Sequence, residues 1–192
     1  MGEDAKYPKR KQIRLRYFDY RQTGLYFVTI CTHDRRSTLG MIRGGAVKLS
    51  PLGRLTITCW ESIPEHSHGV ELGLSVVMPN HLHGLIAVDS QSDPSEARRK
   101  PGELRSRSLG AIVGQFKAAV TRIGRAEGFV GSDTVWQRGF WEHIVRGQRA
   151  YERIQRYIVE NPARWRYDRE NRRRTADDPF DTWITEQGEL PP

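Results

Sequence analysis

Two histidines stand one residue apart at the start of an apolar run, within the segment VVMPNHLHGLIAV. If this run is a β-strand, side chains two residues apart point to the same face, so His81 and His83 lie side by side. Neutral imidazole is a good ligand for several divalent metals, and the pair could share one ion. For an isolated His-x-His, two histidines satisfied by hydrogen bonds are the commoner outcome. A third ligand would favour the metal.

Two polar residues late in the chain are candidates to join the histidines. The segment AYERIQRYIVENP predicts a helix that stops at Pro162. Tyr157 and Asn161 are four residues apart and therefore share one flank of that helix. Spacing alone favours a structural role for both: Tyr157 as a packing aromatic, and Asn161 as a residue at the C-terminal end of the helix, before Pro162. The combination with His-x-His in a basic chain instead favours a phenol and an amide oxygen beside a metal.

The elements that would position these residues alternate between strands and helices. Alternating apolar runs predict strands, and helical spacing with Pro, Ser and Gly boundaries predicts helices. The predicted strands are residues 25–32, 46–49, 70–78, 81–88 and 140–145, the first two forming a hairpin, and the predicted helices are 51–63, 108–123 and 150–161. Residues 90–107 are polar and predict a loop. This order predicts an α+β fold in which helices cover an antiparallel sheet with the histidines on a central strand.

The chain is basic, with 31 Lys and Arg against 23 Asp and Glu and a formal net charge of +8. This balance favours a polyanionic partner, and nucleic acid is the leading candidate. The basic residues gather at 6–16, 98–107 and 164–174, although each run could equally be solvated surface. We predict one domain at residues 25–165, between a basic N-terminal arm (1–24) and an arginine-rich C-terminal tail (166–192).

The cysteines and the hydropathy narrow the class of protein further. Cys31 and Cys59 fit neither a zinc spacing nor a disulfide framework, and we expect buried, reduced thiols. No apolar stretch approaches the roughly 20 residues that span a bilayer, and the N-terminus has no apolar signal core. These features predict a cytoplasmic protein.

Three segments together resemble a known family. VVMPNHLHGLI, WQRGFWEHIVR and YERIQRYIVENPARW, in this order, resemble the HUH single-tyrosine transposases, and within them the REP-associated tyrosine transposases. The resemblance extends from about residue 25 to residue 165. It implies that His81 and His83 are metal ligands, that Tyr157 is the nucleophile and that Asn161 is the third ligand. Insertion-sequence relatives carry glutamine at that third position, so asparagine resembles the REP-associated branch. The implied fold is the ferredoxin-like or RRM-like sandwich of the HUH nucleases.

The resemblance also implies a reaction. The expected activity is that of a single-stranded DNA endonuclease and strand transferase that acts at hairpin-flanked sites, uses Mg2+ or Mn2+ and forms a 5'-phosphotyrosine link. Tyrosine has an unperturbed pKa of about 10 and needs a nearby cation or base to ionise. Three neutral ligands leave the full charge of the ion to act on the phosphate. A monomer in the bacterial cytoplasm or nucleoid is the expected state.

Basic side chains would contact phosphates, and exposed rings could stack on unpaired bases. The candidate DNA-binding residues are Arg14, Arg16, Tyr17, Phe18, Lys117, Arg138, Arg164 and Arg166. A catalytically idle regulator that binds hairpin DNA or RNA on the same sandwich is the alternative, and metal-dependent cleavage would separate the two. A phosphoesterase with paired His-x-Thr or His-x-Ser motifs is disfavoured, because a single His-x-His occurs and Gly84 follows it.

Overall fold

A sheet of four antiparallel strands forms the centre of the molecule. The structure is a computed structural model, and it describes residues 24–89 and 108–188. The strands are β1 (Gly24–Cys31), β4 (Val70–Val77), β5 (His81–Val88) and β6 (Trp141–Ile144), in the spatial order β4-β5-β1-β6. The prediction that the two histidines open a central strand is therefore confirmed.

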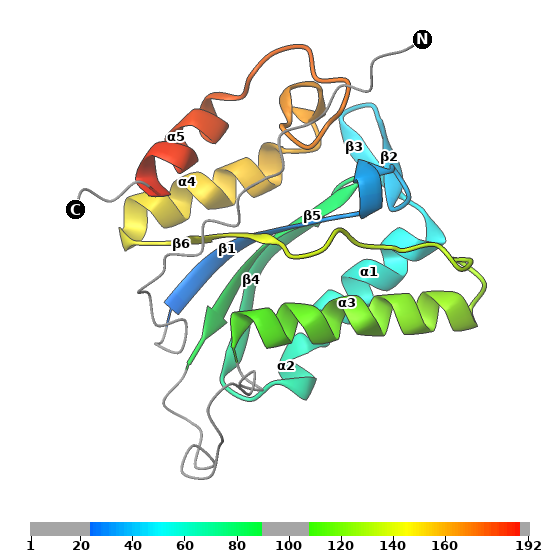
Figure 1. Cartoon of the computed structure of the whole chain (residues 1–192). Helices are drawn as coiled ribbons and strands as arrows, with labels where there is room; N and C mark the ends of the chain where they lie inside the picture. Colours follow the sequence, from blue (N-terminus) through cyan, green and yellow to red (C-terminus); the bar gives the residue numbers. More distant parts are fainter. Residues whose placement is uncertain (1–23, 90–107, 189–192) are drawn as a thin grey trace.

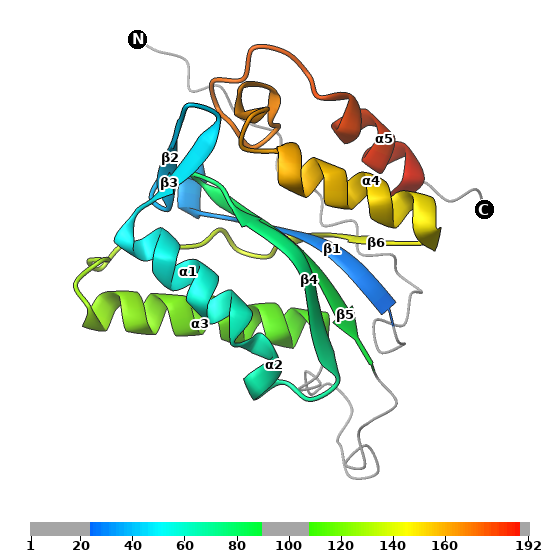
Figure 2. The same ribbon diagram turned by 180° about the vertical axis from the view of Figure 1, so that it is seen from behind.

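Helices cover both faces of this sheet (Figures 1 and 2). On one face lie α1 (Pro51–Glu61) and α3 (Leu109–Ala126), with the short α2 (Ile63–His66) beside them; on the other lie α4 (Gly147–Glu160) and α5 (Pro179–Gly188). The order β1-α1-β4-β5-α3-β6 is the βαββαβ pattern of ferredoxin-like folds. The predicted α+β sandwich is confirmed, and α4 and α5 add a layer to it.

Capping residues account for the starts of the two helices on the first face. The Ser50 hydroxyl accepts a hydrogen bond from the Gly53 N–H at 3.0 Å, and Pro51 occupies the first turn of α1. The Ser108 hydroxyl accepts from the Ala111 N–H at 3.2 Å at the start of α3. Each serine satisfies one of the N–H groups that a helix leaves without an internal partner.

The alternation of side chains along β1 and β5 divides the apolar residues between two cores. The first core lies under α1 and α3 and includes Tyr26, Val28, Ile30, Leu82, Ile86, Trp60 and Phe116. The second lies under α4 and α5 and includes Phe27, Leu85, Ile154, Tyr157, Ile158, Phe180 and Ile184. Gly84 faces the first core, where a Cβ atom would lie 2.4 Å from the Trp60 ring. A larger residue at this position would overlap the indole.

The small hairpin differs from the sequence-based prediction. Residues 46–49 form β3 (Ala46–Leu49), but β3 pairs with β2 (Gly40–Arg43) in a separate two-stranded sheet, not with β1. The predicted pairing of residues 25–32 with 46–49 is wrong. Gly44 and Gly45 have φ angles of +58° and +76°, the conformation of a two-residue hairpin turn, so the chain reverses inside a segment that seemed to be only a long turn.

The C-terminal segment also differs from the expected arginine-rich tail. After the 3-10 turn η3 (Trp165–Tyr167) the chain continues as ordered structure to the end of α5. Asp168, Glu170, Phe180 and Ile184 are all buried, and the last two belong to the second core. The many arginines of this segment obscured the few acidic and apolar positions that hold it against the sheet. A further 3-10 turn, η1 (His33–Arg35), follows β1.

Several predictions fall outside the described residues. They are the N-terminal arm up to residue 23, the loop at 90–107 and the last four residues. Among the helices that the structure describes, none combines the length and apolar character that a membrane crossing requires.

Candidate functional site

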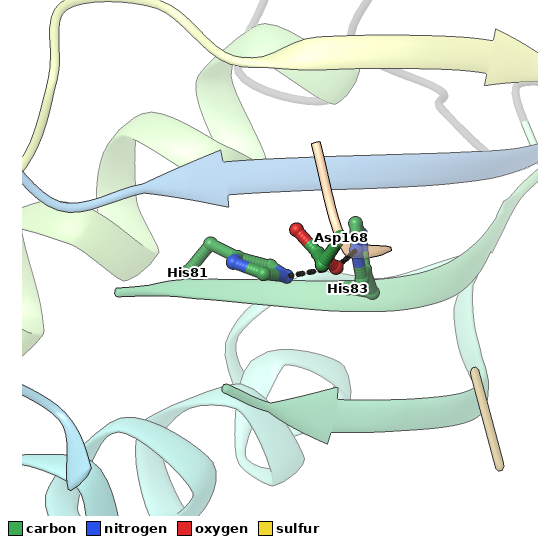
Figure 3. Close-up of side chains that lie close together, drawn as sticks. All are labelled: His81, His83 and Asp168. Atoms are coloured by element: carbon green, nitrogen blue, oxygen red, sulfur yellow. Dashed lines mark ion pairs between the residues drawn. The ribbon is translucent and has the colours of Figure 1, made fainter. Parts of the chain in front are cut away.

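His81 and His83 lie at the start of β5, and their side chains turn toward Asp168 (Figure 3). This is the face that α4 covers, because the Tyr157 hydroxyl of α4 lies beside His83. The strand register places His83 opposite Thr29 of β1, and the Thr29 hydroxyl is 2.9 Å from His83 Nδ1. The centroids of the two imidazole rings are 4.3 Å apart. The two rings therefore share one face of the sheet, as their spacing predicted.

Asn80 fixes the orientation of His81. The Asn80 amide nitrogen donates to the carbonyl oxygens of Arg35 and Glu170, at 3.2 and 2.8 Å. Its oxygen therefore faces His81 Nδ1, 2.8 Å away, and must accept the proton that Nδ1 carries. With the proton on Nδ1, His81 Nε2 presents a lone pair to the interior of the site, which is how a hydrogen-bonded histidine is prepared to bind a metal.

Helix α4 brings Tyr157 and Asn161 to the histidines. Ile154 and Ile158 anchor the helix on the second core, and Tyr157 is buried beside them. The Tyr157 hydroxyl is 3.3 Å from His83 Nε2. Asn161 is the residue at the C-terminal end of α4 and is 1% exposed. The four residues that sequence analysis grouped as His81, His83, Tyr157 and Asn161 thus lie together in the structure.

Asp168 completes the cluster and was missed by sequence analysis. Its Oδ2 lies 3.6 Å from His81 Nε2 and 3.8 Å from His83 Nε2, and Figure 3 shows it between the two rings. The same oxygen accepts hydrogen bonds from the Tyr157 hydroxyl at 3.3 Å and from Asn161 Nδ2 at 2.8 Å. Asp168 falls in a run of arginines, and its spacing from the other residues follows no helix or strand period, so no local pattern could identify it.

Burial and hydrogen bonding set the protonation of the site. Burial lowers the pKa of His81 to about 4, so its imidazole is neutral. Burial alone would raise the pKa of Asp168, but the neighbouring imidazoles and the Asn161 amide outweigh it and hold that pKa below its usual range. Burial raises the pKa of Tyr157 well above its ordinary value, and the Asp168 carboxylate raises it further. In the absence of a cation, Tyr157 is therefore a protonated phenol.

The donor set fits a divalent cation. One ligand atom from each of His81, His83 and Asp168 lies within 4.8 Å of the others, and all three residues are buried. His81 Nε2 and Asn161 Oδ1 are buried acceptors to which no donor of the described residues is hydrogen-bonded. Buried acceptors without partners are rare because each costs free energy, and a cation would satisfy both. The group could therefore hold a metal ion.

The C-terminal segment covers the Tyr157 hydroxyl. The ring of Phe180, at the start of α5, stacks on Tyr157 with centroids 3.7 Å apart and an interplanar angle of 8°. Tyr157 is 3% exposed and His83 is 2% exposed. A macromolecular substrate can contact the hydroxyl only if residues of this segment move.

A partly buried ion pair between Arg35 and Glu170 anchors the covering segment near the start of β5. Arg35 Nε lies 2.6 Å from Glu170 Oε2, and the Glu170 carbonyl accepts from the Asn80 amide. The Glu170 N–H in turn donates to Asp168 Oδ1 at 2.7 Å. Asp168 is therefore positioned by the same contacts that attach the segment to the sheet.

The residues predicted to bind DNA are dispersed. Four of them, Arg14, Arg16, Tyr17 and Phe18, lie outside the described residues. Lys117 is on α3, on the opposite face of the sheet, where Nζ donates to the carbonyl oxygens of Gln137, at 2.8 Å, and Gly139. Burial lowers the pKa of Lys117 to about 8. Its ammonium group is thus engaged inside the protein.

The other predicted DNA-binding residues lie nearer the surface. Arg138 is exposed in the chain before β6. Arg164 Nη2 lies 2.7 Å from Asp178 Oδ1, and the Arg166 guanidinium lies 4.6 Å from the centre of the Tyr167 ring. Arg164 holds the start of α5 in place, whereas Arg138 and Arg166 are placed to meet solvent.

Comparison with known proteins gave three informative relatives, although no family model matches the chain. An uncharacterized protein of Haemophilus influenzae is 37% identical over 166 residues, which are 83% of this chain and 91% of that protein. The REP-associated tyrosine transposase of Escherichia coli is 24% identical over 169 residues, 85% of this chain and 79% of that one. A solved structure of a REP-associated tyrosine transposase bound to a REP hairpin superimposes with a TM-score of 0.54 at 21% identity, and covers 79% of this chain and 73% of that chain.

Proposed function

Because this chain belongs to the family of the REP-associated tyrosine transposases, we propose that it is a single-stranded DNA endonuclease and strand transferase with Tyr157 as its nucleophile. One observation carries the proposal. The Tyr157 hydroxyl lies 3.3 Å from both His83 Nε2 and Asp168 Oδ2, inside the group that could hold a cation. A phenol held only by packing would have no reason to meet a histidine and a carboxylate.

The residues that would hold Mg2+ or Mn2+ are His81 and His83, with Asn161 Oδ1 and Asp168 as the oxygen ligands. Imidazole, amide and carboxylate donors together suit Mn2+ and Mg2+ better than a thiolate-preferring metal. When bound, the ion would polarise a non-bridging phosphate oxygen and stabilise the departing oxygen. Asp168 would reduce the net charge of the site relative to a set of three neutral ligands.

The protein residues would then transfer the phosphoryl group of the DNA to Tyr157. The Tyr157 oxygen attacks the phosphorus, a phosphotyrosine bond forms, and the bond from phosphorus to the 3'-oxygen breaks. Asp168 Oδ2 accepts the hydrogen bond from the hydroxyl and orients it, and it can take up the proton as the phosphotyrosine bond forms. The proton ends on the released 3'-OH. Because the phosphodiester bond is exchanged and not hydrolysed, another 3'-OH can reverse the step without ATP.

The partner that we propose is single-stranded DNA that carries a hairpin. The related structure contains a REP hairpin, and the net charge of +8 on this chain suits a polyanion. The proposal requires that Phe180 and its neighbours withdraw from Tyr157 when DNA binds, since the hydroxyl is covered.

A covalent-adduct assay tests the proposal. Labelled single-stranded DNA with a REP-like hairpin is incubated with the protein, with and without Mn2+, and the mixture is separated under denaturing conditions. We expect an adduct with Mn2+ that Tyr157→Phe abolishes, because the substitution removes one oxygen and keeps the packing ring. Tyr151→Phe, one and a half turns earlier on α4, is the matched control and should form the adduct. Loss in Tyr151→Phe with activity in Tyr157→Phe would contradict the assignment.

The burial of the site favours a second candidate function, a regulator that binds hairpin DNA or RNA without cleaving it. Five side chains of the site are at most 3% exposed. A catalytic centre that no longer reacts with DNA could be buried in this way. The same assay separates the two functions. Tight hairpin binding with no adduct at any Mn2+ concentration would favour the regulator.

A further inference from the structure

A pocket between α4 and α5 borders Tyr157 and is rich in arginine. It encloses about 540 Å³ and is lined by Arg149, Glu152, Arg153, Arg156, Tyr157, Glu160, Arg164, Pro179 and Phe180. Tyr157 and Phe180 are the two buried residues of this lining, so they form its inner wall, and the arginines lie at its exposed rim. The pocket therefore leads from solvent to the stacked rings of Tyr157 and Phe180, next to the covered hydroxyl of the proposed nucleophile.

Three of these arginines form a row along one face of α4. Arg149, Arg153 and Arg156 are spaced four and three residues apart, which places them on one face of α4. Seven residues of helix rise about 10 Å, whereas the phosphates of one strand of duplex DNA rise about 3.4 Å each. The row is thus long enough to contact more than one phosphate of a strand laid along it.

Two of these arginines have no acidic partner within the part of the chain that the structure describes. No ion pair or hydrogen bond joins Arg149 or Arg156 to a described carboxylate. The two carboxylates of the pocket are engaged elsewhere, since Glu152 accepts from Gln148 at 2.8 Å and Glu160 lies 3.4 Å from Arg164. Both guanidinium groups are therefore available to an external anion.

The other two arginines are held by the protein. The Arg153 guanidinium lies 4.5 Å from the centre of the Trp183 ring of α5. Arg164 pairs with Asp178, whose Oδ1 also accepts from the Phe180 N–H at 2.9 Å. These contacts hold the α5 wall of the pocket in the DNA-free protein, while Arg149 and Arg156 stay accessible.

We infer that this pocket binds the phosphodiester backbone of the single-stranded DNA segment next to the scissile phosphate, through Arg149 and Arg156. The inference rests on the proposed function. Guanidinium groups suit phosphates because their planar donors match two oxygens at once. A strand seated on the row would run toward Tyr157, so the two arginines are positioning residues and not catalytic ones.

The test compares a pocket variant with a charge-matched control. Arg149→Gln/Arg156→Gln removes two charges and leaves Arg153 on Trp183 intact. Arg54→Gln/Arg122→Gln removes two charges from α1 and α3, on the opposite face of the sheet. Binding of a labelled DNA hairpin with single-stranded flanks is measured by fluorescence anisotropy in EDTA over a range of salt concentrations, and thermal unfolding checks that each variant is folded.

We expect the pocket variant to bind about tenfold more weakly, and its slope of log affinity against log salt to fall by about 0.7 for each of the two lost contacts. The control variant should keep the slope of the wild type. Replacing flank phosphates one at a time by neutral methylphosphonates should weaken the wild type at two or three adjacent positions, and the pocket variant at none of them, because a shared contact is non-additive.

Three outcomes would overturn the inference. They are equal affinities and slopes in the two double variants, phosphate effects confined to the hairpin stem, and phosphate effects that persist unchanged in the pocket variant. Failure of the proposed function looks different, because the wild type would then form no adduct with any flanked hairpin. If the wild type forms the adduct and the pocket variant binds DNA with normal affinity, only the role of the pocket is refuted, and the proposed function stands. A rise in the DNA concentration needed for half-maximal adduct formation, at an unchanged maximal rate, would support a positioning role.

Discussion

At the scale of single residues, Asn80 offers a sharp test of how the site is prepared. Its oxygen holds the proton of His81 on Nδ1 and so leaves Nε2 for a cation. We expect Asn80→Ala to weaken Mn2+ binding about 10- to 100-fold, measured by isothermal titration calorimetry, because partners of this kind orient metal ligands. Unchanged affinity in Asn80→Ala would show that this hydrogen bond does not prepare His81 for a cation.

The same scale shows why part of the site was predictable. The two-residue period of a strand put His81 and His83 on one face, and the four-residue spacing on a helix put Tyr157 beside Asn161. Asp168 obeys neither period, because it reaches the site from an irregular turn after η3. Its position depends on the Glu170 and Asn80 contacts, which join parts of the chain 90 residues apart. No local pattern encodes a contact of that kind.

At the scale of elements, α5 carries a carboxyl group, Asp181, whose protonation links the stability of the fold to pH. Asp181 is partly buried, and its Oδ2 has no hydrogen-bond partner among the described residues. Burial raises the pKa of Asp181 from 3.8 to about 7; Arg169 opposes this shift, while Asp168, Asp178 and Glu170 add to it. Between these two pKa values the folded protein holds a proton that the unfolded chain has lost. This contribution to stability is complete below about pH 4 and disappears as the pH rises through about 7.

Urea unfolding of the metal-free protein in EDTA tests this dependence. From about pH 5 to about pH 8 the free energy of unfolding should fall more in the wild type than in Asp181→Asn, which cannot ionise. A wild type and a variant with the same pH dependence would show that the carboxyl group is ionised throughout.

The C-terminal segment shows that amino-acid composition alone does not predict where an ordered helix lies. Residues 164–174 contain six arginines, and this density predicted a solvated tail. Phe180 and Ile184 nevertheless give α5 an apolar side that packs on the second core. Four residues apart, they are the minimal signature of a helix stripe, too short to stand out against the surrounding charge. The central sheet was easier to predict, because each of its long strands carries its own pattern.

At the scale of the whole molecule, we predict a preference for a hairpin with single-stranded flanks over a duplex of equal length. A duplex is difficult to bring to a tyrosine that lies against a sheet, whereas a single strand can bend around α4. Anisotropy titrations should show tighter binding of the flanked hairpin, with affinity that falls steeply with salt, by about 0.7 to 0.9 in logarithmic slope for each phosphate contact. Equal affinity for the duplex would contradict this account.

The whole fold also decides which variants of the protein are informative. Deletion of residues 166–192 would remove Asp168 from the site, and Phe180 and Ile184 from the second core. Such a truncation would change stability and charge together. Substitutions of Arg149 and Arg156 on α4 remove charge without removing a contact to a described residue, and they are the cleaner measure of how the protein holds DNA.

The central claim is that Tyr157 attacks DNA, and the most direct measurement identifies the residue that carries the product. After reaction with flanked hairpin DNA and Mn2+, the protein is digested with a protease and a nuclease, and the modified peptide is sequenced by tandem mass spectrometry. We predict a nucleotide joined through its 5'-phosphate to Tyr157. A nucleotide on another residue, or cleaved DNA with no modified peptide, would contradict the account.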